Sequence, residues 1–190
     1  VVVPGGGSYG MEAVARQFAG GKDVLIVRNG WFSYRWTQIF EMAGVASSST
    51  VLKARRLQPG ATAPFAPAPL DEIVSTIRQT RPAVVFAPHV ETSAGLLLPD
   101  DHLKAIADAV HAHDGLFVLD CVASGAMWVD MAQTGVDVLI SAPQKGWSST
   151  PCAGLVMLSP RALARLAQTS SSSFALDLKK WAAIMAAHEQ

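Results

Sequence analysis

The chain has 190 residues and equal numbers of acidic and basic side chains, 15 of each, so its formal net charge is zero. This balance argues against nucleic acid or an anionic membrane as the main partner. Gly, Pro, Asp and Ser interrupt every apolar run well before the roughly 18 residues that a membrane span needs. Charged residues make up only 16% of the chain, which is typical of a protein that covers surface with a second subunit or domain.

Runs of β-branched residues alternate along the chain with longer stretches of helical periodicity. Strands are predicted at Val1–Val3, Val24–Val27, Val51–Ala54, Ala83–Ala87, Leu116–Asp120, Val136–Ile140 and Leu155–Leu158. Helices are predicted at Tyr9–Ala19, Ser33–Ala43, Leu70–Gln79, Asp101–Ala112 and Pro160–Ala167. This alternation predicts an α/β layer fold around a mostly parallel central sheet.

Two stretches outside this alternation are predicted to be connections. Gln58–Pro69 is rich in Pro and Ala and is expected to be an irregular surface segment. Ser170–Ser173 is expected to be a linker into a last helix that shows no Gly or Pro stop. We therefore expect a fragment with one domain over residues 1–167. Residues 168–190 would form the linker and the start of a helix leading to a further domain.

The spacing of cysteine and histidine predicts no metal site. Cys121 and Cys152 have neither CxxC spacing nor a His partner at zinc-site spacing, so neither structural zinc nor a disulfide framework is expected. His111 and His113 point to different sides of a predicted helix and are expected to be solvated. A reducing, cytoplasmic compartment is the default expectation.

Ligands in open α/β sheets bind beyond the carboxyl ends of the strands. The segments that follow predicted strands here are Gly5–Ser8, Asn29–Phe32, His89–Ser93, Asp120–Ser124 and Ala142–Lys145. We expect these five segments to converge on one edge of the sheet. His89 and Glu91 are expected either to shape the site there or to support their own loop.

A glycine-rich turn lies between the first predicted strand and helix. Gly5, Gly7 and Gly10 match the pattern G-x-G-x-x-G, which lets the backbone approach a phosphate at a helix N-terminus. A turn without a ligand is the alternative interpretation. The next strand ends in Arg28-Asn29 without the acidic residue that holds a ribose, which disfavours NAD and leaves NADP open.

Asp120 and Lys145 are the candidate catalytic residues. A carboxylate at the end of an apolar strand is costly to bury unless it is paired, so Asp120 is a candidate partner for a cationic ligand nitrogen. Lys145 lies in the loop after the predicted strand Val136–Ile140, between Gln144 and Gly146, and is a candidate amine nucleophile. An N-cap or a buried salt bridge is the alternative for Asp120, and an exposed surface lysine is the alternative for Lys145. A phosphate-binding turn, such a carboxylate and such a lysine are together what a pyridoxal phosphate (PLP) enzyme needs.

Five sequence blocks resemble the class V aminotransferases of PLP fold type I, in matching order along nearly the whole chain. The blocks are Gly6–Ala13, Asn29–Arg35, His89–Gly95, Asp120–Ser124 and Ser141–Gly146. The resemblance is strongest to the alanine–glyoxylate and serine–glyoxylate branch. It implies the large domain of fold type I for residues 1–167. That domain is a three-layer α/β/α arrangement around a mostly parallel, seven-stranded mixed sheet, with Leu155–Leu158 antiparallel.

The resemblance assigns roles to both catalytic candidates. Lys145 would form the internal aldimine and, once released by substrate, carry the proton between substrate and cofactor carbons. Asp120 would hold the pyridine nitrogen protonated, so that the ring can accept electron density from the substrate.

The resemblance also implies a set of cofactor-binding residues. Gly7 and Ser8, with Gln144, would hold the phosphate. Thr92 would hydrogen-bond near the ring hydroxyl, and Val122 would pack behind the ring. An aromatic side chain should stack on the ring face; alignment favours Phe32, and the adjacent Trp31 is the alternative.

Transamination is the function that the resemblance implies. A small amino acid such as alanine or serine would pass its nitrogen to glyoxylate or another small 2-oxo acid. Other PLP chemistry, as in a lyase, an epimerase or a desulfurase, is the alternative; desulfurases place a His where this chain has Gln144. An NADP-binding oxidoreductase would leave Asp120 and Lys145 unexplained, and a chain that only folds or dimerises is the third possibility. The family also implies a homodimer, with the substrate-binding Arg and a partner-subunit loop beyond Gln190.

Overall fold

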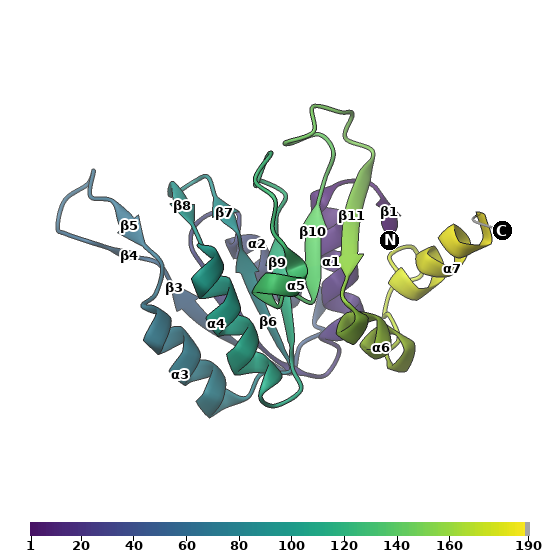
Figure 1. Ribbon diagram of the computed structural model, residues 1–190, viewed down its shortest axis with the longest axis horizontal. Helices are drawn as coiled ribbons and strands as arrows, with labels where there is room; N and C mark the ends of the chain where they lie inside the picture. Colours follow the sequence, from purple (N-terminus) through teal and green to yellow (C-terminus); the bar gives the residue numbers. More distant parts are fainter. Residues whose placement is uncertain (189–190) are drawn as a thin grey trace.

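Seven strands form one central sheet in the computed structural model, which describes residues 1–188 (Figure 1). The strands lie in the order β1-β11-β10-β9-β6-β2-β3. Their bounds are β1 Val2–Pro4, β2 Asp23–Arg28, β3 Ser48–Lys53, β6 Val84–Pro88, β9 Leu116–Asp120, β10 Val138–Ser141 and β11 Ala153–Leu158. Each corresponds to one of the seven predicted strands.

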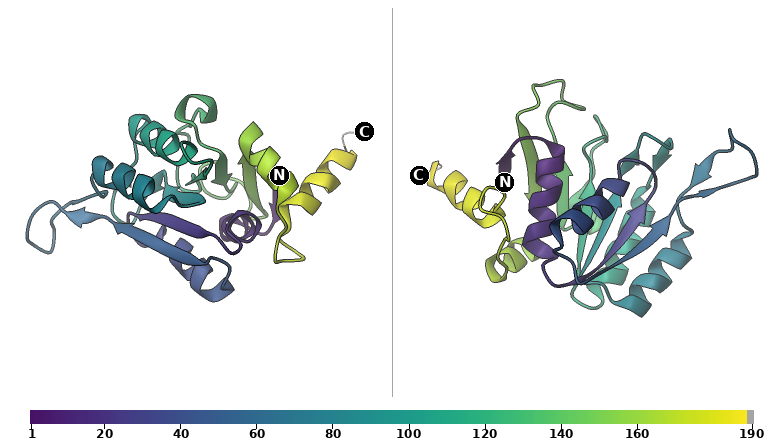
Figure 2. Two further views of the ribbon diagram at one scale, coloured as in Figure 1. Left: turned by 90° about the horizontal axis from the view of Figure 1, so that it is seen from below. Right: turned by 180° about the vertical axis from the view of Figure 1, so that it is seen from behind.

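Helices cover both faces of this sheet (Figures 1 and 2). Their bounds are α1 Gly7–Phe18, α2 Tyr34–Ala43, α3 Leu70–Thr80, α4 Asp100–His111, α5 Met131–Thr134, α6 Pro160–Gln168 and α7 Leu178–His188. Helices α1 and α2 lie on one face, and α3 and α4 lie on the other. The predicted α/β/α layers are therefore confirmed.

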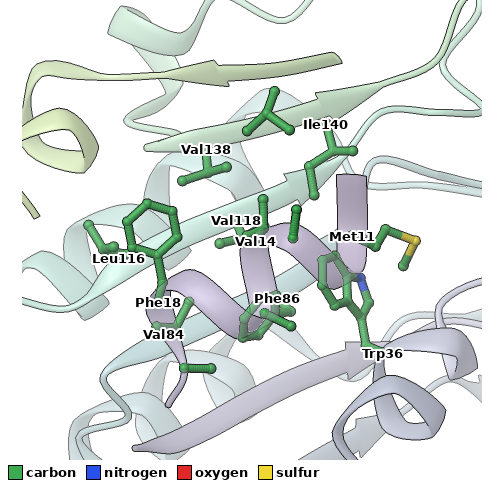
Figure 3. Packing of buried hydrophobic residues seen from close by; sticks show 14 of the residues in the cluster. Met11, Val14, Phe18, Trp36, Val84, Phe86, Leu116, Val118, Val138 and Ile140 are labelled. Carbon is green, nitrogen blue, oxygen red and sulfur yellow. The ribbon is translucent and has the colours of Figure 1, made fainter. Parts of the chain in front are cut away.

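Alternation along the strands divides the core into two clusters. In β2, Val24 and Ile26 face α1 and α2, whereas Leu25 and Val27 face α3 and α4. The first cluster contains an aromatic group in which the Trp36 and Phe86 ring centroids lie 4.5 Å apart (Figure 3). Helices exclude water from both faces of a strand such as β2, so Val24–Val27 is a continuous hydrophobic run.

Strand direction brings the functional segments to one edge. The pairs β10–β9, β9–β6, β6–β2 and β2–β3 are parallel, and β11 is antiparallel to both β10 and β1. The antiparallel placement of the last strand is confirmed. Because β1 thereby points the same way as β10, its carboxyl end meets those of the five parallel strands.

Two short hairpins and one short helix were not predicted. Strands β4 (Arg55–Arg56) and β5 (Phe65–Ala66) form a hairpin that projects from the sheet, and β5 lies within the stretch expected to be irregular (Figure 1). Strands β7 (Val90–Glu91) and β8 (Leu96–Leu97) form another, with Gly95 at a φ of 65° between them. Helix α5 has four residues. Elements this short contain too few residues to show a period.

His111 and His113 differ from their predicted solvated state. His111 Nε2 lies 2.7 Å from Oδ2 of the buried Asp137, and His113 Nε2 lies 2.9 Å from the carbonyl oxygen of Pro82. Both partners lie just before a strand of the sheet, Pro82 before β6 and Asp137 before β10, and the end of α4 packs beside them. No helix within residues 1–188 is long and apolar enough to cross a membrane.

Candidate functional site

Asp120 lies at the centre of the edge where the strands end. It pairs in register with Pro88 of β6 and Ile140 of β10. The Asp120 carbonyl oxygen accepts a hydrogen bond from His89 N (2.9 Å), and Cys121 N donates to the Ile140 carbonyl oxygen (2.8 Å). Three of the predicted site segments therefore begin side by side on neighbouring strands.

The Asp120 carboxylate is buried and sparsely bonded. Only 8% of the residue is exposed, and Val122 N donates to its Oδ1 at 3.0 Å. Burial raises the pKa of Asp120 to about 6, against the opposing effects of the Val122 hydrogen bond and the Arg35 charge; the Glu91 charge adds to the rise. A buried acid of this kind gains from a cationic partner, which would restore its ionised form.

The glycine turn at the start of α1 packs directly against Val122, two residues after Asp120. Helix α1 begins at Gly7, and its N-cap residue Gly6 provides no side-chain hydrogen bond to the first turn. A Cβ on Gly7 would come within 2.7 Å of Val122 Cγ2. The first N–H groups of a helix have no partner within it. Tyr9 N and Gly10 N donate to the Gly6 carbonyl oxygen. The turn therefore leaves the N–H groups of Gly7 and the exposed Ser8 without a partner among residues 1–188.

The loop after β10 brings Gln144 to the same glycine turn. Gln144 Nε2 lies 3.5 Å from the position that a Cβ on Gly6 would occupy. Gln144 Oε1 is buried and has no hydrogen-bond partner within residues 1–188. The next residue, Lys145, is exposed, and Gly146 packs so closely on Gly125 that a Cβ would not fit. The loop is held at these glycines while the Lys145 side chain remains in the open.

Phe32 and Trp31 occupy different environments. Phe32 is 36% exposed and Trp31 is 68% exposed. The Arg35 guanidinium lies 5.9 Å from the Phe32 ring centroid, and its charge also acts on Asp120. The Trp31 ring lies 6.3 Å from that of Tyr34 and lines a surface pocket of about 340 Å³ with Lys53 and other residues. Arg35 thus links Phe32 to the Asp120 region.

Glu91 is fully buried and connects the aromatic segment to the β7–β8 hairpin. Its Oε1 accepts hydrogen bonds from Phe32 N (3.2 Å) and Ser93 Oγ (2.6 Å). Its Oε2 accepts from Ser33 N (2.8 Å) and Ser33 Oγ (2.7 Å). The exposed Thr92 lies between Glu91 and Ser93. Of the two roles expected for Glu91, the structure therefore shows a link between loops.

Sequence reasoning did not single out this network or the contact between His89 and Ser124. His89 Nδ1 lies 2.7 Å from Ser124 Oγ, and both residues are buried. Cys121 is buried, and burial raises the pKa of its thiol to about 12. In the sequence these polar residues directly follow apolar strands. That pattern indicates where they lie but does not identify their hydrogen-bond partners.

Comparisons with known proteins agree with the resemblance. A family model described as Aminotransferase class-V matches residues 2–185. The chain is 32% identical over 184 residues to 2-aminoethylphosphonate–pyruvate transaminase 2 of Paraburkholderia xenovorans (strain LB400), covering 94% of the chain and 45% of that relative. It is 30% identical over 183 residues to the alanine–glyoxylate aminotransferase of Callithrix jacchus, covering 94% of the chain and 41% of that relative.

A solved structure shows the same fold. The ureidoglycine–glyoxylate aminotransferase of Bacillus subtilis matches with a TM-score of 0.78 at 28% identity, covering 94% of this chain and 44% of that one. The chain spans a little under half the length of these relatives. Because the family model matches nearly every residue and a solved member shares the fold, the chain belongs to the class V aminotransferase family.

Proposed function

We propose that this chain is the cofactor-binding part of a PLP-dependent aminotransferase. Members of the family and fold are in general PLP-dependent. The proposed reaction moves the amino group of a small amino acid, such as alanine or serine, to glyoxylate or another small 2-oxo acid. The relatives include glyoxylate and pyruvate transaminases, which supports the proposed class of acceptor.

The buried Asp120 carboxylate is the observation that carries this proposal. It lies at the end of β9 with a single hydrogen bond from Val122 N among the contacts of residues 1–188. Burial raises its pKa to about 6, and the Val122 hydrogen bond and the Arg35 charge offset only part of this rise. The protonated pyridine nitrogen of PLP would supply that counter-charge, and Asp120 would then keep the nitrogen protonated.

The remaining residues fit the other parts of the same cofactor. The bare N-terminal turn of α1 suits a phosphate, because free N–H groups and the helix dipole both favour an anion. Gln144 Nε2, which lies 3.5 Å from the position of a Cβ on Gly6, is the donor that would reach a phosphate at this turn. Val122 would lie behind the ring, Phe32 on its face and Thr92 near its hydroxyl.

Bound PLP supplies an electron-accepting ring, and the chain supplies binding and proton transfer. Lys145 Nζ would hold the cofactor through its aldehyde carbon, with loss of water. Once a substrate amine has displaced it, the free Lys145 amine would take the proton from the substrate carbon and return it. Its exposed position, one residue from the phosphate-binding Gln144, gives the side chain the freedom to do both. We propose that residues 1–167 form this PLP-binding unit and that a linker and a helix follow it. Helix α7 packs back onto the unit through Leu178, which is buried in the first core cluster.

Covalent trapping tests the proposal. PLP is added to the purified chain, the visible spectrum is recorded, and borohydride reduction is followed by peptide mass spectrometry. We expect a yellow species and modification of Lys145. Lys22→Ala, which removes an exposed lysine from a turn outside the site segments, should leave both unchanged. Modification elsewhere, or none in this chain and in a longer protein containing it, would refute the proposal.

We propose that two copies associate beside this site. Aromatic side chains are exposed near the strand ends, since Trp128 is 85% exposed and Trp147 is 46% exposed. Exposed apolar residues in such a group are typical of a surface that a partner covers. Sedimentation equilibrium should show a dimer, and a monomer at all concentrations tested would contradict the proposal.

A further inference from the structure

We propose that Glu91 is a positioning residue that holds Phe32 in place as the surface on which the cofactor ring stacks. The inference rests on the proposed function. It concerns one carboxylate that binds no ligand itself and acts through the backbone of residues 29–33.

All five consecutive N–H groups of this segment reach Glu91, either directly or through one hydroxyl. Phe32 N and Ser33 N donate to the carboxylate. Asn29 N (2.8 Å) and Gly30 N (3.0 Å) donate to Ser33 Oγ, which donates to Glu91 Oε2. In the same way, Trp31 N donates to Ser93 Oγ at 2.8 Å, and this hydroxyl donates to Glu91 Oε1.

Only a carboxylate satisfies this arrangement. Both Glu91 oxygens accept from an N–H and an O–H, whereas a glutamine would turn an NH₂ group toward one of these pairs. Burial works to raise the pKa of Glu91, but the hydrogen bonds from Ser93, Ser33 and Phe32 outweigh it and keep the pKa below its ordinary value. The carboxylate therefore stays charged, and charge-assisted hydrogen bonds are the strong ones.

The position of Gly30 shows how tightly the segment is wound around the carboxylate. A Cβ at Gly30 would overlap Ser93 Oγ and would lie 2.7 Å from Glu91 Cγ. The segment and the hairpin therefore contact each other directly at this residue.

The network engages the backbone and leaves two side chains available. Because the amides of residues 29–33 are already bonded, they are not donors for a ligand. Phe32 is bonded at its own N–H, and Thr92 lies between two members of the network. Both proposed ring contacts are therefore held by the same carboxylate, which points to positioning beyond general stability.

A double-mutant cycle tests this inference through PLP affinity. We expect Glu91→Gln to weaken binding roughly 10- to 100-fold, because the ring would lose the stacking of Phe32 and the nearby contact of Thr92. Phe32→Leu should weaken it roughly tenfold through loss of stacking. If Glu91 acts through Phe32, the PLP affinity of the double variant should be no lower than that of the single variant with the lower affinity.

Ser93→Ala provides a milder second variant, because it removes one bridging hydroxyl at an exposed residue and leaves the carboxylate. It should also be non-additive with Phe32→Leu. Glu72→Gln is the control. Glu72 lies in α3, outside the Glu91 network, and makes an exposed ion pair with Arg55. It should leave PLP affinity unchanged.

Amide hydrogen exchange without PLP provides a readout independent of the cofactor. Glu91→Gln should speed exchange in a peptide spanning residues 29–33 at least tenfold, while Glu72→Gln should not. Losses of PLP affinity that multiply in the double variant, or unchanged exchange in this segment, would overturn the inference. If the wild-type chain and a longer protein containing it bind no PLP, the proposed function fails, and the exchange result then reports only on the loop.

Discussion

The two loops that carry proposed cofactor contacts are built in opposite ways. In the segment 29–33, every backbone N–H is bonded within a network centred on a buried carboxylate. In the loop after β10, residues 145–150 are exposed, and the N–H of Lys145 makes one long contact, 3.4 Å, to Ala142 O. A surface for ring stacking must stay fixed, whereas a lysine that attaches to and leaves the cofactor must move. The contrast matches those two tasks.

Removing Lys145 gives the largest expected effect. Lys145→Ala should abolish covalent attachment of PLP completely, because no other amine follows Gln144 in the loop. The exposed side chain contributes little to the fold, so the free energy of unfolding should change by less than about 0.5 kcal/mol. Borohydride trapping and urea unfolding measure the two quantities. A variant that still traps PLP would show that the open loop does not carry the nucleophile.

Removing the Asp120 carboxylate should weaken PLP binding roughly 100-fold in Asp120→Ala, because a buried ionic partner of the ring nitrogen is lost. Titration followed by absorbance measures the affinity. A PLP analogue with carbon in place of the ring nitrogen is the control ligand, since Asp120 has nothing to pair with there. Equal losses for both ligands would show that Asp120 acts only on the fold.

The same residue predicts a pH dependence of stability. The pKa of Asp120 lies at about 6 in the folded chain and at its ordinary 3.8 when unfolded. The folded state therefore holds a proton that the unfolded state releases, and wild-type stability falls by up to ~3 kcal/mol as pH rises from about 4 to about 6.

Asp120→Asn cannot ionise, so without PLP it should gain on the wild type by about that amount between pH 4 and pH 7. Urea unfolding at the two pH values measures the gain. Glu41→Gln, at an exposed residue of α2, should show no such trend. A difference between Asp120→Asn and wild type that is the same at both pH values would contradict the buried, unpaired state of Asp120.

The glycine turn gives the smallest expected effect. Gly7→Ala should cost about 1–3 kcal/mol of unfolding free energy, since the new Cβ would meet Val122 Cγ2 at 2.7 Å. Gly20→Ala is the matched control, because a Cβ there has no neighbour within 4 Å. Adding Val122→Ala to Gly7→Ala should recover part of the loss. Full additivity of the two changes would mean that the turn and Val122 do not touch.

Most of the fold could be predicted from the sequence. Strands such as Leu116–Asp120 are buried on both faces, so each is an unbroken apolar run that ends at a polar residue. The helix starting at Gly7 was predicted from Tyr9 instead, because glycine and serine carry no helical signal. The candidate site residues Asp120, Lys145, Gly7 and Gln144 were found because each follows a strand and matches a family motif.

The sequence by itself determined the α/β class, the edge where the candidate ligand site lies and the types of residue gathered there. Local periodicity is sufficient for this, since it depends on near neighbours in the chain. Only the tertiary structure decided that Glu91 gathers the amides of residues 29–33, that Val122 fills the space beside Gly7 and that the Asp120 carboxylate is buried with one hydrogen bond from residues 1–188. The contact between Glu91 and Ser33 joins residues 58 positions apart. The partners in such a contact depend on strand order and burial, which no local pattern encodes.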